Sequence, residues 1–164
     1  METEYSQTDA ASGAHWLTSS TPQFSLPEFL YRLYMPPIEV VAALIRDSEG
    51  KALLVRKRGT QAFMQPGGKR DAGESDEAAL AREIDEELGC KVIAGSVRRL
   101  GEFVCSAANE PGRDVKAVVY AVEVTGDIKP AAEIDEIIWV DPASPQERLL
   151  APLTRDHVLP LAIG

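Results

Sequence analysis

The hydrophobic residues of this chain fall into short runs separated by polar turns, a pattern typical of strands. Two such runs, IEVVAALIRD at 38–47 and KALLVRKR at 51–58, lie on either side of a polar turn at 48–50. Extended runs joined by a short polar turn are typical of a β-hairpin. We therefore predict that these two strands form a hairpin.

Runs further along the chain predict more strands. One or two strands are expected within 92–104, broken near Gly101, and a buried strand is expected at 115–124. Another should lie within 133–140. The sequence Asn-Glu-Pro-Gly inside 107–114 is rich in turn-forming residues, so a loop is expected there.

Two segments have the pattern of helices. Residues 76–88 contain neither proline nor glycine, Ser75 before them is a favourable N-cap, and Gly89 stands where a left-handed C-cap would end a helix. The segment 145–163 has leucines and valines at helical spacing, interrupted by Pro152. Strands and helices in this order predict an α/β fold, a mixed sheet with helices on both faces, or α/β/α sandwich.

Length and composition predict one domain with an extension before it. The chain has 164 residues, of which 45% are hydrophobic, enough for one domain with a proper core at 38–164. Residues 1–37 are expected to form an N-terminal extension, partly mobile or docked, because its first part is rich in Ser, Thr and Ala. Its aromatic segment from Phe29 to Tyr34 suggests a homodimer contact.

Charge and cysteine content exclude several classes of partner. A net charge of −9 disfavours binding to duplex nucleic acid, which requires a basic surface. The longest apolar run, 40–45, is too short to cross a membrane. The N-terminus lacks the pattern of a signal peptide, and two cysteines do not make a disulfide framework. We expect a cytoplasmic protein that binds neither duplex nucleic acid nor membrane.

The predicted helix at 76–88 concentrates acidic residues in an unfavourable way. Glu83, Glu86 and Glu87 share one helix face, where like charges repel each other and oppose the helix dipole at its C-terminal end. An acidic helix face is usually solvated surface. Local rules broken in one place also indicate a functional site, and carboxylate oxygens in this number suit Mg²⁺ or Mn²⁺.

The same stretch resembles the Nudix box of the Nudix hydrolases. Gly68 is followed after five residues by Glu74, and after seven more by Arg82-Glu83-Ile84-Asp85-Glu86-Glu87-Leu88-Gly89-Cys90. Every fixed position matches in register except Cys90, where the family usually has an aliphatic residue. The resemblance implies the Nudix type of α/β/α sandwich and a metal-dependent hydrolase of diphosphate bonds.

The resemblance also implies roles for individual residues. Glu83, Glu86 and Glu87 are the predicted metal ligands, joined by a backbone carbonyl of the glycine turn at Gly67 or Gly68. Arg82 is expected to orient a carboxylate, either Glu86 or Glu74. The general base is one of the ligand carboxylates or a carboxylate from elsewhere, for which Glu133 is the first candidate. The predicted catalytic residues are accordingly Glu83, Glu86, Arg82 and Glu133.

Candidates for substrate binding lie on two loops. Lys69 and Arg70 follow the glycine turn, and Asn109 and Arg113 lie on the loop at 107–113, which could equally be a plain hairpin turn. We predict Mg²⁺-dependent hydrolysis of a nucleoside diphosphate linked to another moiety, with release of a nucleoside monophosphate. A sensor without catalytic activity and a hydrolase of non-nucleotide diphosphates are the alternatives, and the substrate itself stays open.

Overall fold

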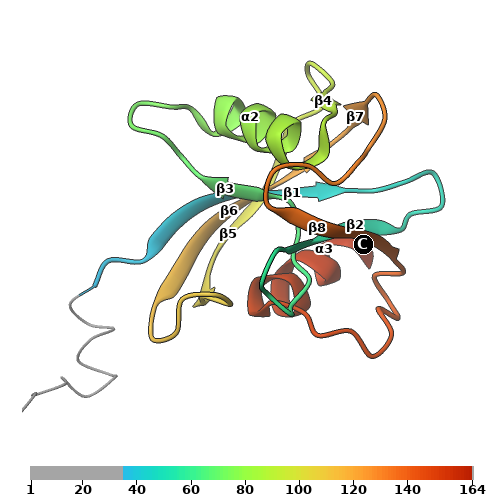
Figure 1. Cartoon of the computed structure of the whole chain (residues 1–164). Helices are drawn as coiled ribbons and strands as arrows, with labels where there is room; N and C mark the ends of the chain where they lie inside the picture. Colours follow the sequence, from blue (N-terminus) through green and yellow to red (C-terminus); the bar gives the residue numbers. More distant parts are fainter. Residues whose placement is uncertain (1–34, 164) are drawn as a thin grey trace, which may run out of the picture.

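The computed structural model describes residues 35–163 of the chain. Its central sheet has four strands in the order β3-β1-β6-β5 (Figure 1). These are β1 (Ile38–Ile45), β3 (Gly67–Lys69), β5 (Arg98–Ser106) and β6 (Asp114–Val122). Strand β1 runs parallel to β6, and the two other pairs are antiparallel, so the sheet is mixed as predicted.

Two smaller sheets complete the strands. Strand β2 (Ala52–Lys57) pairs antiparallel with β8 (Ile134–Val140). The short strands β4 (Lys91–Val92) and β7 (Val124–Thr125) form the other pair. The loop predicted at 107–114 is confirmed, because it joins β5 to β6.

The predicted hairpin between the first two runs is wrong, although both strands exist. A tight turn returns the chain, with Arg46 and Ala52 bridged, but β1 then pairs with β6 along its whole length and β2 pairs with β8. Residues 41–45 and 52–55 are all buried. Both faces of these residues are covered, so their partner strands are set by packing across the whole fold, and long-range pairing replaced the local hairpin.

The break predicted near Gly101 is a local irregularity within one strand. Strand β5 continues through it, and its register against β6 shifts between Arg99 and Gly101. A glycine inside a strand often marks such a bulge, where one extra residue is accommodated without ending the pairing. The prediction gave the correct position of the irregularity, but the expected break in the strand is wrong.

The acidic helix α2 (Asp76–Leu88) has the predicted ends. The Ala78 backbone N–H donates to Ser75 Oγ at 3.2 Å, and Gly89 ends the helix in the left-handed conformation with a φ of 65°. Its buried side chains Ala79, Leu80, Ile84 and Leu88 pack with β1 and β2 residues in one core cluster. The helix therefore presents an apolar side to the sheet, while Glu83 and Glu87 are also buried and Glu77 and Glu86 are exposed.

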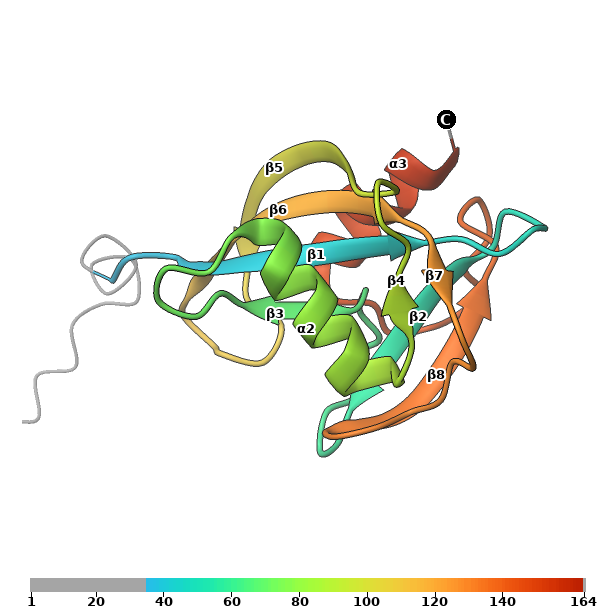
Figure 2. The same cartoon turned by 90° about the horizontal axis from the view of Figure 1, so that it is seen from above.

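The C-terminal helical segment lies on the opposite side of the sheet (Figures 1 and 2). It contains a π-helical turn η1 (Thr154–Val158), followed by α3 (Leu159–Ile163). The helical pattern predicted at 145–163 is confirmed only from Pro152 onward, because residues 145–151 are not helical. Pro152 lies at the beginning of the helical segment and does not interrupt it, since the first turn of a helix tolerates a missing N–H. A mixed sheet with helices on both faces is thus confirmed.

Some sequence predictions concern residues that the structure does not describe. The N-terminal extension at 1–37 lies almost wholly outside the described residues, and so does the dimer contact at Phe29 to Tyr34. Within 35–163, none of the helices is long and apolar enough to span a bilayer.

Candidate active site

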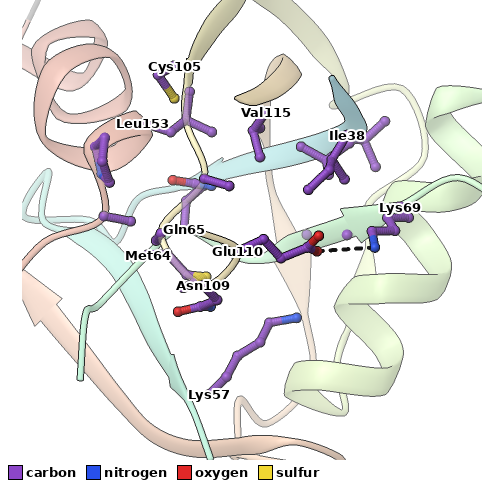
Figure 3. Close-up of a pocket in the computed structure, with 18 of the residues that line it drawn as sticks. Ile38, Lys57, Met64, Gln65, Lys69, Cys105, Asn109, Glu110, Val115 and Leu153 are labelled. Carbon is purple, nitrogen blue, oxygen red and sulfur yellow. Dashed lines mark hydrogen bonds and ion pairs between the residues drawn. The ribbon is translucent and has the colours of Figure 1, made fainter. Parts of the chain in front are cut away.

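A cavity of about 470 Å³ lies where the glycine turn, helix α2 and the loop at 107–110 meet (Figure 3). One part of its wall is charged and includes Lys57, Lys69, Glu83 and Glu133. Another part is aliphatic. It is formed by residues such as Ile38, Met64, Val115 and Leu153. The volume and the division into two parts suit a ligand of nucleotide size.

The glycine turn brings backbone and carboxylates into direct contact. The Gly67 N–H donates to Glu87 Oε2 at 3.0 Å. A Cβ built on Gly68 would lie 2.4 Å from Glu83 Oε1, so the absence of a side chain lets the Glu83 carboxylate lie against the turn. The second glycine thus makes room for a functional group.

Arg82 braces the acidic residues around this turn. Its Nε and Nη2 donate to the two carboxylate oxygens of Glu74 at 3.0 and 2.8 Å, a bidentate arrangement. Its Nη1 donates to Glu83 Oε1 at 2.7 Å, and Glu86 Oε2 lies 3.6 Å away. The hydrogen bonds from Arg82 lower the pKa of Glu74 to about 2. The structure places Arg82 where it orients carboxylates, and of the two partners predicted, Glu74 is the nearer.

Lys57 connects two acidic groups that lie far apart in the sequence. Its Nζ lies 3.0 Å from Glu87 Oε1 and 2.9 Å from Glu133 Oε1. Glu87 is completely buried, and burial raises its pKa even though Lys57 acts in the opposite direction. Burial lowers the pKa of Lys57, but the two carboxylates outweigh it and the pKa is raised. Both effects follow from placing a lysine between carboxylates in a partly closed site.

The predicted substrate-binding residues divide into two pairs. Lys69 and Asn109 line the cavity, and Lys69 Nζ lies 3.4 Å from Glu110 Oε1 (Figure 3). Arg70 does not line it, because its guanidinium is held by Asp76 and Glu39.

Arg113 is also not among the residues that line the cavity. It donates to the Pro36 carbonyl at 3.0 Å and to Glu110 Oε2 at 3.2 Å. The structure therefore brings Lys69 and Asn109 to the predicted site, and does not bring Arg70 or Arg113 there.

The acidic residues fit a hard cation by chemistry, although they are not assembled around one point. All candidate donors are oxygens, and Gly68 leaves space beside the Glu83 carboxylate. Across residues 35–163 no three or more acidic, histidine or cysteine side chains are grouped closely enough to hold a metal ion. The reason is visible in the contacts. Arg82 holds Glu83, Lys57 holds Glu87, and Glu86 is exposed.

Sequence reasoning missed several cavity residues. Lys57 and Glu110 line the cavity, and neither is among the residues predicted for the site. The buried hydrogen bond from Thr154 Oγ1 to Gln65 Oε1, 2.8 Å long, joins residues 89 positions apart. No local pattern signals such a contact, because it arises only when the C-terminal helical segment packs beside the glycine turn.

Fold and site together define a domain in which an acidic helix and a glycine turn border a nucleotide-sized cavity. The family description "NUDIX domain" matches residues 36–161, which is most of the chain. The chain therefore belongs to the Nudix hydrolase family, as the box at Gly68 to Cys90 predicts.

Relatives with assigned activities carry several different substrate names. The chain is 36% identical to the CTP pyrophosphohydrolase of Escherichia coli over 124 residues, covering 73% of this chain and 84% of that protein. It is 46% identical over 70 residues to the 8-oxo-dGTP diphosphatase of Haemophilus influenzae, covering 40% of this chain and 52% of that protein. It is 30% identical to the ADP-ribose pyrophosphatase of Methanocaldococcus jannaschii, covering 68% of this chain and 66% of that protein. The alignments thus span only part of the last two relatives.

Solved structures agree with the fold. The MutT protein from Methanosarcina mazei matches with a TM-score of 0.64 at 28% identity, covering 79% of this chain and 95% of that one. The MutT NUDIX hydrolase from Burkholderia pseudomallei matches with a TM-score of 0.66 at 25% identity, covering 77% of this chain and 98% of that one.

Proposed function

We propose that this protein hydrolyses a phosphoanhydride bond in a nucleoside diphosphate linked to another moiety, with Mg²⁺ as cofactor, and releases a nucleoside monophosphate. The observation that carries the proposal is the cavity itself. Its charged wall contains Glu83 and the glycine turn, and its aliphatic wall offers space for a base. Family membership supports the same reaction class.

Glu83, Glu86, Glu87 and the Gly68 carbonyl would hold the cation. A bound Mg²⁺ would neutralise charge on the phosphate oxygens and make the phosphorus more electrophilic. Two of the carboxylates now pair with Arg82 and Lys57, so cation binding competes with these protein charges. Binding of a diphosphate would in turn give Lys57 and Lys69 new anionic partners.

Glu133 is proposed as the general base. It lines the cavity, and its pKa is lowered chiefly by the hydrogen bond from Lys57. A lowered pKa keeps the carboxylate ionised, and an ionised carboxylate can accept a proton from water. Glu86 and Glu83 are the alternatives on the helix.

Binding of a nucleotide, rather than another diphosphate, is favoured by the relatives. The printed names of three of them include CTP, 8-oxo-dGTP and ADP-ribose, all of which contain a base joined to phosphate through ribose or deoxyribose. The aliphatic wall with Ile38, Val115 and Leu153 would receive the flat apolar faces of such a base.

The test is a hydrolysis screen with Mg²⁺ over nucleoside triphosphates, ADP-ribose, dinucleotides, nucleotide sugars, and isoprenoid and inositol diphosphates. We expect turnover of at least one nucleotide, and loss of that turnover in Glu86→Gln and in Glu87→Gln with the fold retained. Glu77→Gln, an exposed position on the same helix, is the matched control and should keep full activity.

Two results would contradict the proposal. A variant at Glu86 or Glu87 that keeps the wild-type rate in saturating Mg²⁺ would refute the ligand assignment. A compound that raises the melting temperature while nothing in the screen is cleaved would favour the sensor alternative.

A further inference from the structure

On the aliphatic side of the cavity, the polar side chain of Gln65 forms a hydrogen bond with a buried residue outside the cavity. Gln65 is 9% exposed and lines the cavity, on the side of Met64 and Leu153 and away from Lys69 (Figure 3). Thr154 is fully buried, does not line the cavity, and donates from Oγ1 to Gln65 Oε1 at 2.8 Å. The amide oxygen is therefore occupied by the protein itself.

The amide nitrogen of Gln65 is in the opposite situation. Within 35–163 no hydrogen-bond partner for Nε2 is found, and this nitrogen is not enclosed among the buried unpartnered atoms. Because Gln65 lines the cavity, a ligand bound there can reach this nitrogen. A largely buried donor without a protein partner costs free energy unless water or a ligand accepts its hydrogens. This feature points to a ligand with acceptor atoms at this end of the cavity.

The hydrogen bond from Thr154 restricts what Gln65 can recognise. A free glutamine side chain pairs with adenine through both amide atoms, since the oxygen accepts from the N6 amino group and the nitrogen donates to N7. When the oxygen is held by Thr154, only the two N–H donors remain. Guanine presents two acceptors, O6 and N7, on the corresponding edge. An amide limited to donation can bond to both guanine acceptors, but only to N7 of adenine, because the N6 amino group of adenine is itself a donor.

The distance between Gln65 and the charged wall suits a residue that contacts the base of a nucleotide whose phosphates bind at that wall. Gly67 and Gly68 follow it by two and three positions, so they lie at most roughly 7–10 Å away along the chain, at about 3.3 Å per residue. None of the described residues that line the cavity is aromatic, so hydrogen bonding has more weight here than ring stacking.

We propose that Gln65, oriented by Thr154, is a specificity-determining residue that selects keto purine nucleotides over adenine nucleotides. The proposal rests on the proposed function, since it assigns the base of that same substrate. Gln65 would contact the substrate, and Thr154 is a positioning residue that acts through Gln65.

The experiment compares kcat/KM for dGTP and dATP in the wild type, Gln65→Leu, Thr154→Val and Thr154→Ser. The wild type should prefer dGTP by about tenfold or more, the range expected for one well-placed pair of hydrogen bonds to a base. Gln65→Leu should lose this preference while still cleaving both nucleotides. Thr154→Val frees the amide to turn, so activity on dATP should rise relative to dGTP, and Thr154→Ser should keep the wild-type ratio.

A binding measurement separates this inference from the catalytic proposal. Calorimetry should show that the wild type binds GMP more tightly than AMP. The three variants should change this binding preference in the same way as they change the ratio of kcat/KM, whether or not turnover occurs. Turnover or binding with a ratio that Thr154→Val and Gln65→Leu leave unchanged would overturn the inference and leave the hydrolase proposal intact. A wild-type preference for adenine would also overturn it, because the amide oxygen would then face the cavity.

Discussion

The two glycines of the turn have different reasons to be glycine. Gly67 has a φ of 135°, and a Cβ there would lie 2.2 Å from the backbone oxygen of Val41 in the neighbouring strand. Gly68 does not have a positive φ, and the three atoms nearest to an added Cβ there all belong to the side chain of Glu83. One glycine is therefore required by the sheet, and the other by the site.

Substituting these glycines should separate folding from activity. Gly68→Ala should displace the Glu83 carboxylate and lower turnover about 100-fold, because misplacement of a catalytic group by about 1 Å has this effect. Its melting temperature should stay close to that of the wild type. Gly67→Ala is the contrasting variant and should destabilise the protein by about 2 kcal/mol or more, since backbone strain is added to a clash. Thermal unfolding and a turnover assay on both proteins check this, and a Gly68→Ala protein with full activity would contradict it.

Helix α2 shows how an element tolerates a cluster of like charges. Its cap residues Ser75 and Gly89 follow ordinary rules, and its apolar residues pack against the sheet. Its carboxylates are balanced by cations that lie on different elements, except for Arg82 on the helix itself. That arginine ties the helix to the preceding turn through Glu74 and, through its hydrogen bond to the Lys69 carbonyl, to the end of β3.

The link between Arg82 and Glu74 should give stability a specific dependence on pH. The pKa of Glu74 in the folded protein is about 2, lowered from 4.5. Its stabilising contribution is therefore fully present above about pH 4.5 and is lost as the pH falls towards 2. Denaturant unfolding of wild type and Glu74→Gln should differ at pH 7, with the variant less stable, and should converge in acid. Glu77→Gln is the control, because no cation within residues 35–163 pairs with Glu77, and a difference that persists to low pH would contradict the assignment.

At the scale of the whole molecule, the site is formed from parts that the chain brings together over long distances. Lys57 at the end of β2 lies between Glu87 of α2 and Glu133 before β8. The cavity wall also takes residues from the C-terminal helical segment and from the loop between β5 and β6. The residues that we propose for catalysis and for substrate selection thus lie on different elements, and the fold brings them to one cavity.

Removing the lysine tests the competition between protein and metal charges. Lys57→Met should bind Mg²⁺ or Mn²⁺ more tightly than the wild type, because Glu87 no longer has a competing partner. Without metal it should lose up to about 3 kcal/mol of stability, as expected for a buried carboxylate left unpaired. Calorimetry with the metal alone and unfolding in the presence of a chelator measure the two effects. Arg58→Met, at the exposed neighbouring position, should change neither, and weaker metal binding in Lys57→Met would contradict this account.

Local chemistry explains which features could be predicted. Short stretches of sequence predict the ends of α2, the strand at 38–45 and the loop after β5. The signals are helix caps, a run of apolar residues and turn residues, and each of them spans only a few positions. The hairpin prediction failed because the choice of a partner strand depends on whether both faces of a strand are buried. A short stretch of sequence does not show this burial. For Arg70 and Arg113, closeness in sequence to predicted site loops was a poor guide, since each guanidinium found acidic or carbonyl partners elsewhere.

The sequence by itself determined the family, the acidic helix and the glycine turn, because the spacing of carboxylates and caps along one helix is set by the helix repeat. Only the tertiary structure decided which cations neutralise Glu83 and Glu87, which loop residues reach the cavity, and that Thr154 fixes the amide of Gln65. These contacts join residues that are up to 89 positions apart. Their geometry depends on how sheets and helices pack, and no periodicity along the chain encodes it.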